Sequence, residues 1–163
     1  SSAGRLFDAV SAIAGLCDEQ SDEAQAAMLL EAAGGDFADA SYEEDDFVVT
    51  QESGLNVLQV TALLQRLFAM RLEGRTPQAI SMRFHAAFSA GMAKLAAECF
   101  PAGATVCLSG GTFLNRFVAA DLSRRLRQMG YRTYLPSLLP PGDGAISFGQ
   151  CAVARQRLDA ATH

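Results

Sequence analysis

The stretch TVCLSGGTFLNRFVAADLSRRLRQMGYRTYL, which spans Thr105–Leu135, decides the fold class. Its first four residues have the apolar, β-branched composition of a buried strand, and Ser109–Gly111 predicts a tight turn. The apolar spacing then predicts a helix over residues 115–129 that ends at a glycine, followed by a second strand over residues 131–135. A strand, a helix and a strand in this order indicate a βαβ unit with two parallel strands.

The rest of the chain is predicted to be mostly helical, so we expect one helix-rich α/β domain over residues 1–163. Residues 47–50 predict a short strand. Helices are predicted over residues 4–16, about 22–33, about 56–72, from Pro77 onward, and from Asp143 to about Leu158.

Charge and apolar patterning restrict the partners. The net charge is -5 and includes the acidic run Glu43–Asp46, which we interpret as a solvated loop, so nucleic acid is not an expected partner. Apolar runs are too short for a membrane span and no signal-peptide pattern opens the chain, so we expect a cytoplasmic protein. Because Ser1 stands where an initiator methionine would, we expect an excised piece of a longer protein.

The cysteines and histidines predict no complete metal site. None of the four cysteines forms a Cys-x-x-Cys pair, and three lie in apolar stretches, so we expect reduced thiols that act as small apolar residues. His85 follows Phe84 in an apolar helix and is interpreted as a core histidine. It belongs to no His-x-x-x-His pair.

Three positions carry candidate chemistry, each with a plain structural alternative. Gly110 and Gly111 follow a strand and precede a helix, where main-chain N–H groups can bind a phosphate, although such turns often need only a positive φ. Asp143 either caps the final helix or binds a metal. Asp8, on the first helix, either faces water or accepts hydrogen bonds from a ribose.

Three blocks of the sequence carry a resemblance to one family: GRLFDAV (Gly4–Val10), SGGTFLNR (Ser109–Arg116) and PPGDGAISFGQ (Pro140–Gln150), with weaker matches at Glu23–Met28 and Arg83–His85. Together they resemble the HypF-type carbamoyltransferases that mature nickel-iron hydrogenases. The resemblance implies the C-terminal part of a Kae1-like domain. It therefore implies one lobe of the actin/Hsp70-type, RNase H-like ATPase fold, with a small mixed sheet.

The resemblance implies that the parent protein transfers a carbamoyl group in several steps. Carbamoyl phosphate and ATP yield carbamoyl-adenylate in other domains, and the Kae1-like domain transfers the carbamoyl group to the C-terminal cysteine of the partner HypE, towards the cyanide ligands of the hydrogenase iron. The matching positions imply Gly110 and Gly111 at the nucleotide phosphates, with Asn115 nearby. The other implied site residues are Gly4 and Asp8 at the ribose, Glu23 near the adenosine, and Asp143 as one ligand of a divalent metal, Fe or Zn.

The remaining metal ligands implied by the family form a His-x-x-x-His motif that this chain lacks. We therefore expect the fragment to be inactive without the rest of HypF in cis, and not to retain the metal. Thr112, Leu114, Gly142 and Ala145 depart from the family pattern. Alternatives are an O-carbamoyltransferase or threonylcarbamoyl-transferase relative, or a non-catalytic docking module that forms a homodimer.

Overall fold

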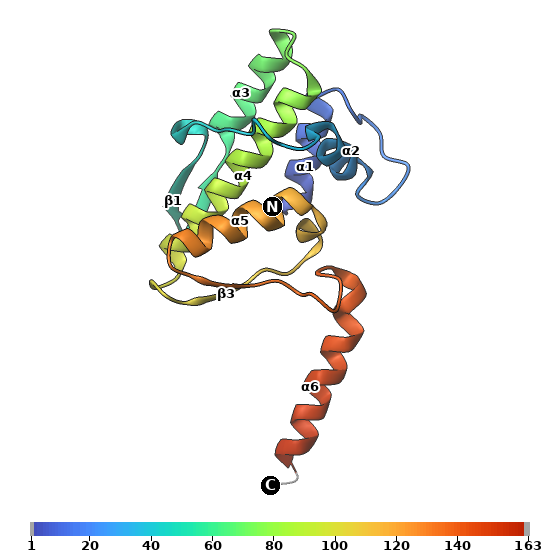
Figure 1. Cartoon of the computed structure of the whole chain (residues 1–163), viewed down its shortest axis with the longest axis vertical. Helices are drawn as coiled ribbons and strands as arrows, with labels where there is room; N and C mark the ends of the chain where they lie inside the picture. The colour runs from blue at the N-terminus through green and yellow to red at the C-terminus, as the bar shows by residue number, and fades with distance from the viewer. Residues whose placement is uncertain (1, 162–163) are drawn as a thin grey trace.

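The computed structural model describes residues 2–161, and the helix-rich α/β class is confirmed. The described strands form two separate two-stranded sheets instead of one small mixed sheet. Figure 1 shows the order of the elements along the chain. The helices and strands are α1 (Ala3–Ile13), α2 (Gln25–Gly34), β1 (Val48–Glu52), β2 (Leu55–Gln59), α3 (Thr61–Leu72), α4 (Pro77–Cys99), β3 (Thr105–Cys107), α5 (Arg116–Gln128), β4 (Arg132–Tyr134) and α6 (Ile146–Ala161), and the 3-10 turns are η1 (Glu44–Asp46), η2 (Gly111–Leu114) and η3 (Asp143–Ala145).

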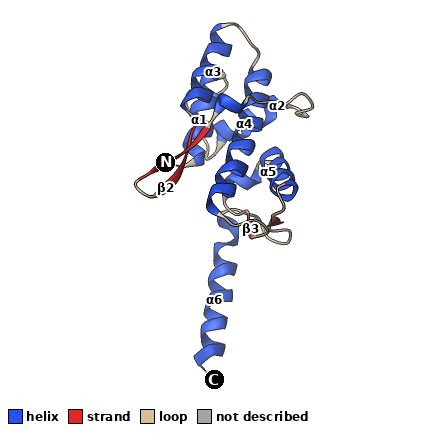
Figure 2. Cartoon of the chain, turned by 90° about the vertical axis from the view of Figure 1, so that its left-hand side faces the viewer, coloured by secondary structure: helices blue, strands red, loops and turns tan. Residues whose placement is uncertain are grey.

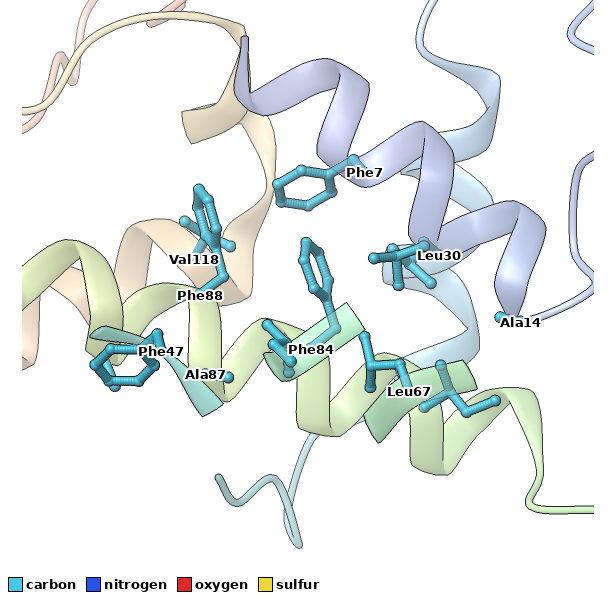
Figure 3. Close-up of a cluster of buried hydrophobic side chains, with 13 residues drawn as sticks. Phe7, Ala14, Leu30, Phe47, Leu67, Phe84, Ala87, Phe88 and Val118 are labelled. Carbon is cyan, nitrogen blue, oxygen red and sulfur yellow. The ribbon is translucent and has the colours of Figure 1, made fainter. Parts of the chain in front are cut away.

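Helix α4 lies at the centre of the body, with the other helices of the main core and the β1-β2 hairpin against it (Figures 1 and 2). It begins as its sequence predicts: Thr76 Oγ1 accepts a hydrogen bond from Ala79 N at 3.2 Å, and Pro77 occupies the first turn. Its apolar face joins α1, where the rings of Phe7 and Phe84 meet edge to face at 4.8 Å (Figure 3). Burial of each such large side chain stabilises the fold by about 1.5–3 kcal/mol.

The β1-β2 hairpin corrects one predicted helix. Residues 56–59, expected to begin a helix that continued to residue 72, instead pair antiparallel with β1, and the helix α3 begins only at Thr61. The turn between the strands consists of Ser53 and Gly54, whose φ angles are 51° and 80°. Two residues with positive φ suit a tight hairpin turn. The Ser53-Gly54 pair is therefore a local sign of a turn, and the sequence prediction gave more weight to the helical periodicity of the residues after it.

The predicted βαβ unit is confirmed. Strands β3 and β4 are parallel, with Val106 opposite Thr133, and α5 crosses between them. Val106 and Leu108 form a second small core with Leu122 and Leu126 of α5. This core holds the carboxyl end of β3 against α5, so it fixes the place where the glycine turn begins.

The acidic run 43–46 is solvated only in part: Glu43, Glu44 and Asp45 are exposed, but Asp46 is fully buried. Its carboxylate accepts hydrogen bonds from Glu43 N at 2.8 Å and Arg83 Nη2 at 2.9 Å, and it pairs with Arg66 Nε at 3.1 Å. Two arginines from α3 and α4 thus offset the cost of burying the charge. The prediction was therefore wrong for Asp46 alone, because both of its arginine partners are distant in sequence.

The cysteine prediction was correct for bonding and wrong for burial. All four thiols are free, but Cys17 is only half-buried and the other three are exposed.

Helix α6, predicted to reach Leu158, continues to Ala161 and projects away from the body (Figures 1 and 2). It displays exposed apolar side chains, among them Ile146 at 55% and Phe148 at 61% exposure. Within residues 2–161, no helix combines the length and apolar character that a bilayer crossing requires.

Candidate functional site

The glycine turn lies where β3 ends and is held by the loop before α6. Gly110 has φ 112°, a conformation that a side chain would strain. Its N–H donates to Pro141 O at 2.7 Å, and Ser109 Oγ donates to the same oxygen at 3.3 Å. The main chain before Asp143 is therefore fastened directly to the turn.

Gly111 differs from Gly110, because the protein itself gives no reason for a glycine there. Its φ is not positive, and a Cβ added to it would meet no atom within 4 Å. The N–H groups of Gly111 and Thr112 precede the first hydrogen bond of η2, which runs from Phe113 N to Gly110 O at 3.0 Å. The turn thus presents open main chain, where an anionic ligand could approach closely.

Asp143 is brought next to this turn. A Cβ on Gly142 would lie 3.5 Å from Gly111 Cα, so the two loops are in contact. The carboxylate of Asp143 begins η3, is exposed, and makes no hydrogen bond with any residue in the range 2–161. The helix-capping alternative is therefore not observed.

A metal fits Asp143 only as a shared ligand. One exposed carboxylate without a protein partner suits a single coordination position of a divalent ion. Within the described residues no group of three His, Cys, Asp or Glu side chains could hold a metal. The other ligands would have to come from outside this part of the chain.

The residues expected at the nucleoside lie on α1 and in the connection that follows it. Gly4 and Asp8 are on α1, where Asp8 is 27% exposed and pairs with Arg5 at 3.4 Å. Glu23 is exposed in the connection between α1 and α2. Phe7, beside Asp8, contacts the ring of His85 edge to face at 5.6 Å, and this contact connects α1 with the glycine turn.

His85 is a buried core histidine, as predicted. Its Nδ1 lies 2.8 Å from Ser81 O, and its Nε2 lies 2.9 Å from Asn115 Nδ2. Burial lowers the pKa of the imidazole to about 4 from its ordinary 6.5, and the bond to the Ser81 carbonyl opposes this shift. His85 is therefore neutral at physiological pH.

Asn115, expected near the phosphates, is only 7% exposed and caps α5 by accepting from Val118 N at 3.0 Å. Two groups at the site were not predicted from the sequence. Glu31 Oε1 accepts from Arg116 N at 2.9 Å, and the Pro141 carbonyl binds the turn. Neither carries a local signal, because each acts across a tertiary contact.

Comparison with known proteins identifies the family of this chain. The family described as "Carbamoyltransferase, Kae1-like Domain, second subdomain" matches residues 1–150. A carbamoyltransferase HypF homolog of Cupriavidus necator is 35% identical over 168 residues, covering 99% of this chain and 42% of the relative. Carbamoyltransferase HypF of Rhizobium leguminosarum bv. viciae is 39% identical over 167 residues, covering 96% of this chain and 20% of the relative.

Solved structures show the same relationship. The crystal structure of full-length HypF in the phosphate- and nucleotide-bound form superposes with a TM-score of 0.82 at 33% identity, covering 97% of this chain and 25% of that one. HypF of T. kodakarensis gives a TM-score of 0.72 at 25% identity, covering 98% of this chain and 20% of that one. This chain thus spans less than half the length of each of these four relatives. Sequence and fold together show that the chain belongs to the HypF-type carbamoyltransferases, in which it matches the second subdomain of the Kae1-like domain.

Proposed function

We propose that this chain forms one wall of the nucleotide site of a carbamoyltransferase that uses carbamoyl phosphate and ATP, through carbamoyl-adenylate. The acceptor is the C-terminal cysteine of HypE, and the product serves the cyanide ligands of a nickel-iron hydrogenase in the cytoplasm. The observation that carries the proposal is Gly111, a glycine that neither backbone strain nor packing requires, with open main chain beside the Asp143 loop. A phosphate approaching that main chain would require the absence of a side chain.

The other site residues have roles consistent with their positions. Gly110 and Gly111 present the turn to the phosphates, and Gly4 and Asp8 of α1 hold the ribose. Glu23 lies towards the adenosine side, and Asp143 provides one ligand of an Fe or Zn ion. When bound, that ion would supply Lewis-acid stabilisation of charge on the transferred group or the phosphate.

The transfer of the carbamoyl group needs no reactant besides carbamoyl-adenylate and the acceptor thiolate. The acceptor thiolate attacks the carbamoyl carbon, an S–C bond forms, and the C–O bond to the adenylate breaks. AMP leaves with the bonding electron pair. This chain positions the leaving group and excludes water from one side, while the opposite wall comes from the rest of HypF in cis. We therefore infer that the 163-residue chain alone is inactive and does not retain the metal.

The test is a transfer assay with the full-length protein, carbamoyl phosphate, ATP and HypE. Intact-mass analysis should show one carbamoyl group on HypE, and none on a HypE variant whose C-terminal cysteine is serine. The isolated chain should give no transfer with the same reagents. Transfer to neither protein, with AMP still released, would contradict the assigned acceptor, and transfer to a small hydroxyl compound would favour an O-carbamoyltransferase.

Helix α6 favours a second, docking role. Its exposed apolar residues include Phe148 at 61%, and the preceding loop displays Leu138 at 96% exposure. We expect the rest of HypF to cover this surface in cis, and a second copy to cover it in the isolated chain. Sedimentation should therefore show concentration-dependent dimers that Phe148→Ser weakens, and a strict monomer at all concentrations would refute the docking role.

A further inference from the structure

Asn115 occupies the junction between the glycine turn and α5, and its side chain is already engaged on both sides. Resting on the proposed function, we propose that Asn115 is a positioning residue, held by His85, that sets the geometry of the glycine turn and does not itself bind the nucleotide. Its Oδ1 accepts from Val118 N at 3.0 Å, and its Nδ2 donates to His85 Nε2 at 2.9 Å. With 7% of its surface exposed, little of the amide is left for a ligand.

The hydrogen-bond directions are consistent along the whole network. The Ser81 carbonyl can only accept, so His85 Nδ1 carries the proton and Nε2 offers a lone pair. That lone pair requires the amide nitrogen of Asn115 and turns its oxygen towards α5. Ser81 Oγ in turn donates to Leu30 O of α2, so three helices determine the orientation of one amide.

Aromatic side chains keep water away from this bond. The ring of His85 is fully buried, and its centroid lies 4.9 Å from that of Phe37 and 5.9 Å from that of Phe117. Phe7 and Phe84 contact it at 5.6 Å and 5.4 Å. Because no water can replace a lost partner, breaking the bond leaves a buried polar group unsatisfied.

The turn is thereby fastened at both ends. Gly110 N binds Pro141 O at one end, and Asn115 binds His85 at the other. Only η2 lies between the two attachments. Glu31 still holds Arg116 N, so loss of the Asn115 contact would loosen the turn without releasing α5.

The experiment compares His85→Phe, which keeps a ring and removes the acceptor, with His85→Gln, whose amide oxygen can replace Nε2. Asn115→Ser keeps an α5 cap and loses the contact with His85. Asn56→Ser is the control, because the side-chain amide of Asn56 donates an exposed hydrogen bond to Glu98 O, away from the glycine turn. Amide exchange is measured in the 163-residue chain at Gly110 and Phe113, whose N–H groups are hydrogen-bonded in the turn. ATP affinity is measured in the full-length protein.

We expect His85→Phe and Asn115→Ser each to speed exchange in the turn and to weaken ATP binding, both by about tenfold, which corresponds to one buried hydrogen bond. His85→Gln should keep the exchange rate and the ATP affinity of the unmodified protein. The double variant His85→Phe/Asn115→Ser should be no worse than either single change, because both changes remove the same hydrogen bond. The 15N signals of the His85 ring should shift in Asn115→Ser and stay unchanged in the control.

Unchanged exchange and affinity in His85→Phe, with a loss of affinity in Asn115→Ser, would identify Asn115 as a direct ligand and overturn the proposal. If His85→Phe does not fold, unchanged exchange in Asn115→Ser overturns it equally. An unmodified protein that binds no ATP would refute the proposed function, whereas the exchange and 15N measurements would still decide the role of Asn115.

Discussion

Replacing Asp46 with alanine should destabilise the chain by an amount that its burial determines. The carboxylate is fully buried and is bound by Arg66, Arg83 and the Glu43 main chain. Breaking a buried ion pair costs about 3–5 kcal/mol. Arg66 is 37% exposed and retains Asp45, and Arg83 retains Glu43, so we expect the lower end, about 3 kcal/mol.

The matched control is Asp45→Ala, which removes the 75% exposed partner of the same Arg66 and should cost less than about 1 kcal/mol. Urea unfolding followed by circular dichroism gives both free energies of unfolding. A loss of about 3 kcal/mol would also lower Tm by about 6–12 °C in a chain of this size. Equal losses for Asp46→Ala and Asp45→Ala would refute the assignment of Asp46 to the core.

Three further predictions concern the pH dependence, the hairpin and α6. The pKa of His85 is about 4 in the folded chain and about 6.5 in the unfolded chain. Between these pH values the unfolded chain binds more protons, so protonation favours unfolding. His85 should therefore contribute a loss of about 2–3 kcal/mol of stability as pH falls from 7.5 to 4.5. Urea unfolding at both pH values should show a smaller loss in His85→Gln, and identical losses would contradict the buried neutral imidazole. Gly54→Ala should cost about 1 kcal/mol through its positive φ, measured against Gly111→Ala, which has neither a positive φ nor a neighbour within 4 Å. Phe148→Ser should change the unfolding free energy of the monomeric chain by less than about 0.5 kcal/mol, and a larger loss would show that α6 packs on the body.

Local patterns predicted the elements whose signals lie close together in sequence. The βαβ unit follows from one apolar run, two glycines and one amphipathic helix, all within residues 105–135. The start of α4 follows from Thr76 and Pro77 alone. By contrast, β2 was assigned to a helix because its apolar residues continue into the true helical pattern of α3, and only its pairing with β1 distinguishes them.

In the candidate site, too, some residues could be predicted from local sequence patterns and others could not. Gly110, Gly111 and Asp143 could be proposed from short motifs, and the structure places their loops in contact. The attachments that hold the turn, Pro141 to Gly110 and His85 to Asn115, could not be predicted. Each joins segments about 30 residues apart. Their partners are therefore fixed by the packing of the whole body.

The most direct test of the central claim is calorimetric titration of ATP into the full-length protein carrying Gly111→Ala. The substitution introduces no strain and no contact within 4 Å, so the unfolding free energy should stay within about 0.5 kcal/mol of the unmodified protein. A methyl group on the main chain that approaches the phosphates should nevertheless weaken ATP binding by at least about tenfold. Gly149→Ala, on α6, should bind ATP normally. Unchanged ATP affinity in Gly111→Ala would contradict the claim that this turn receives the nucleotide phosphates.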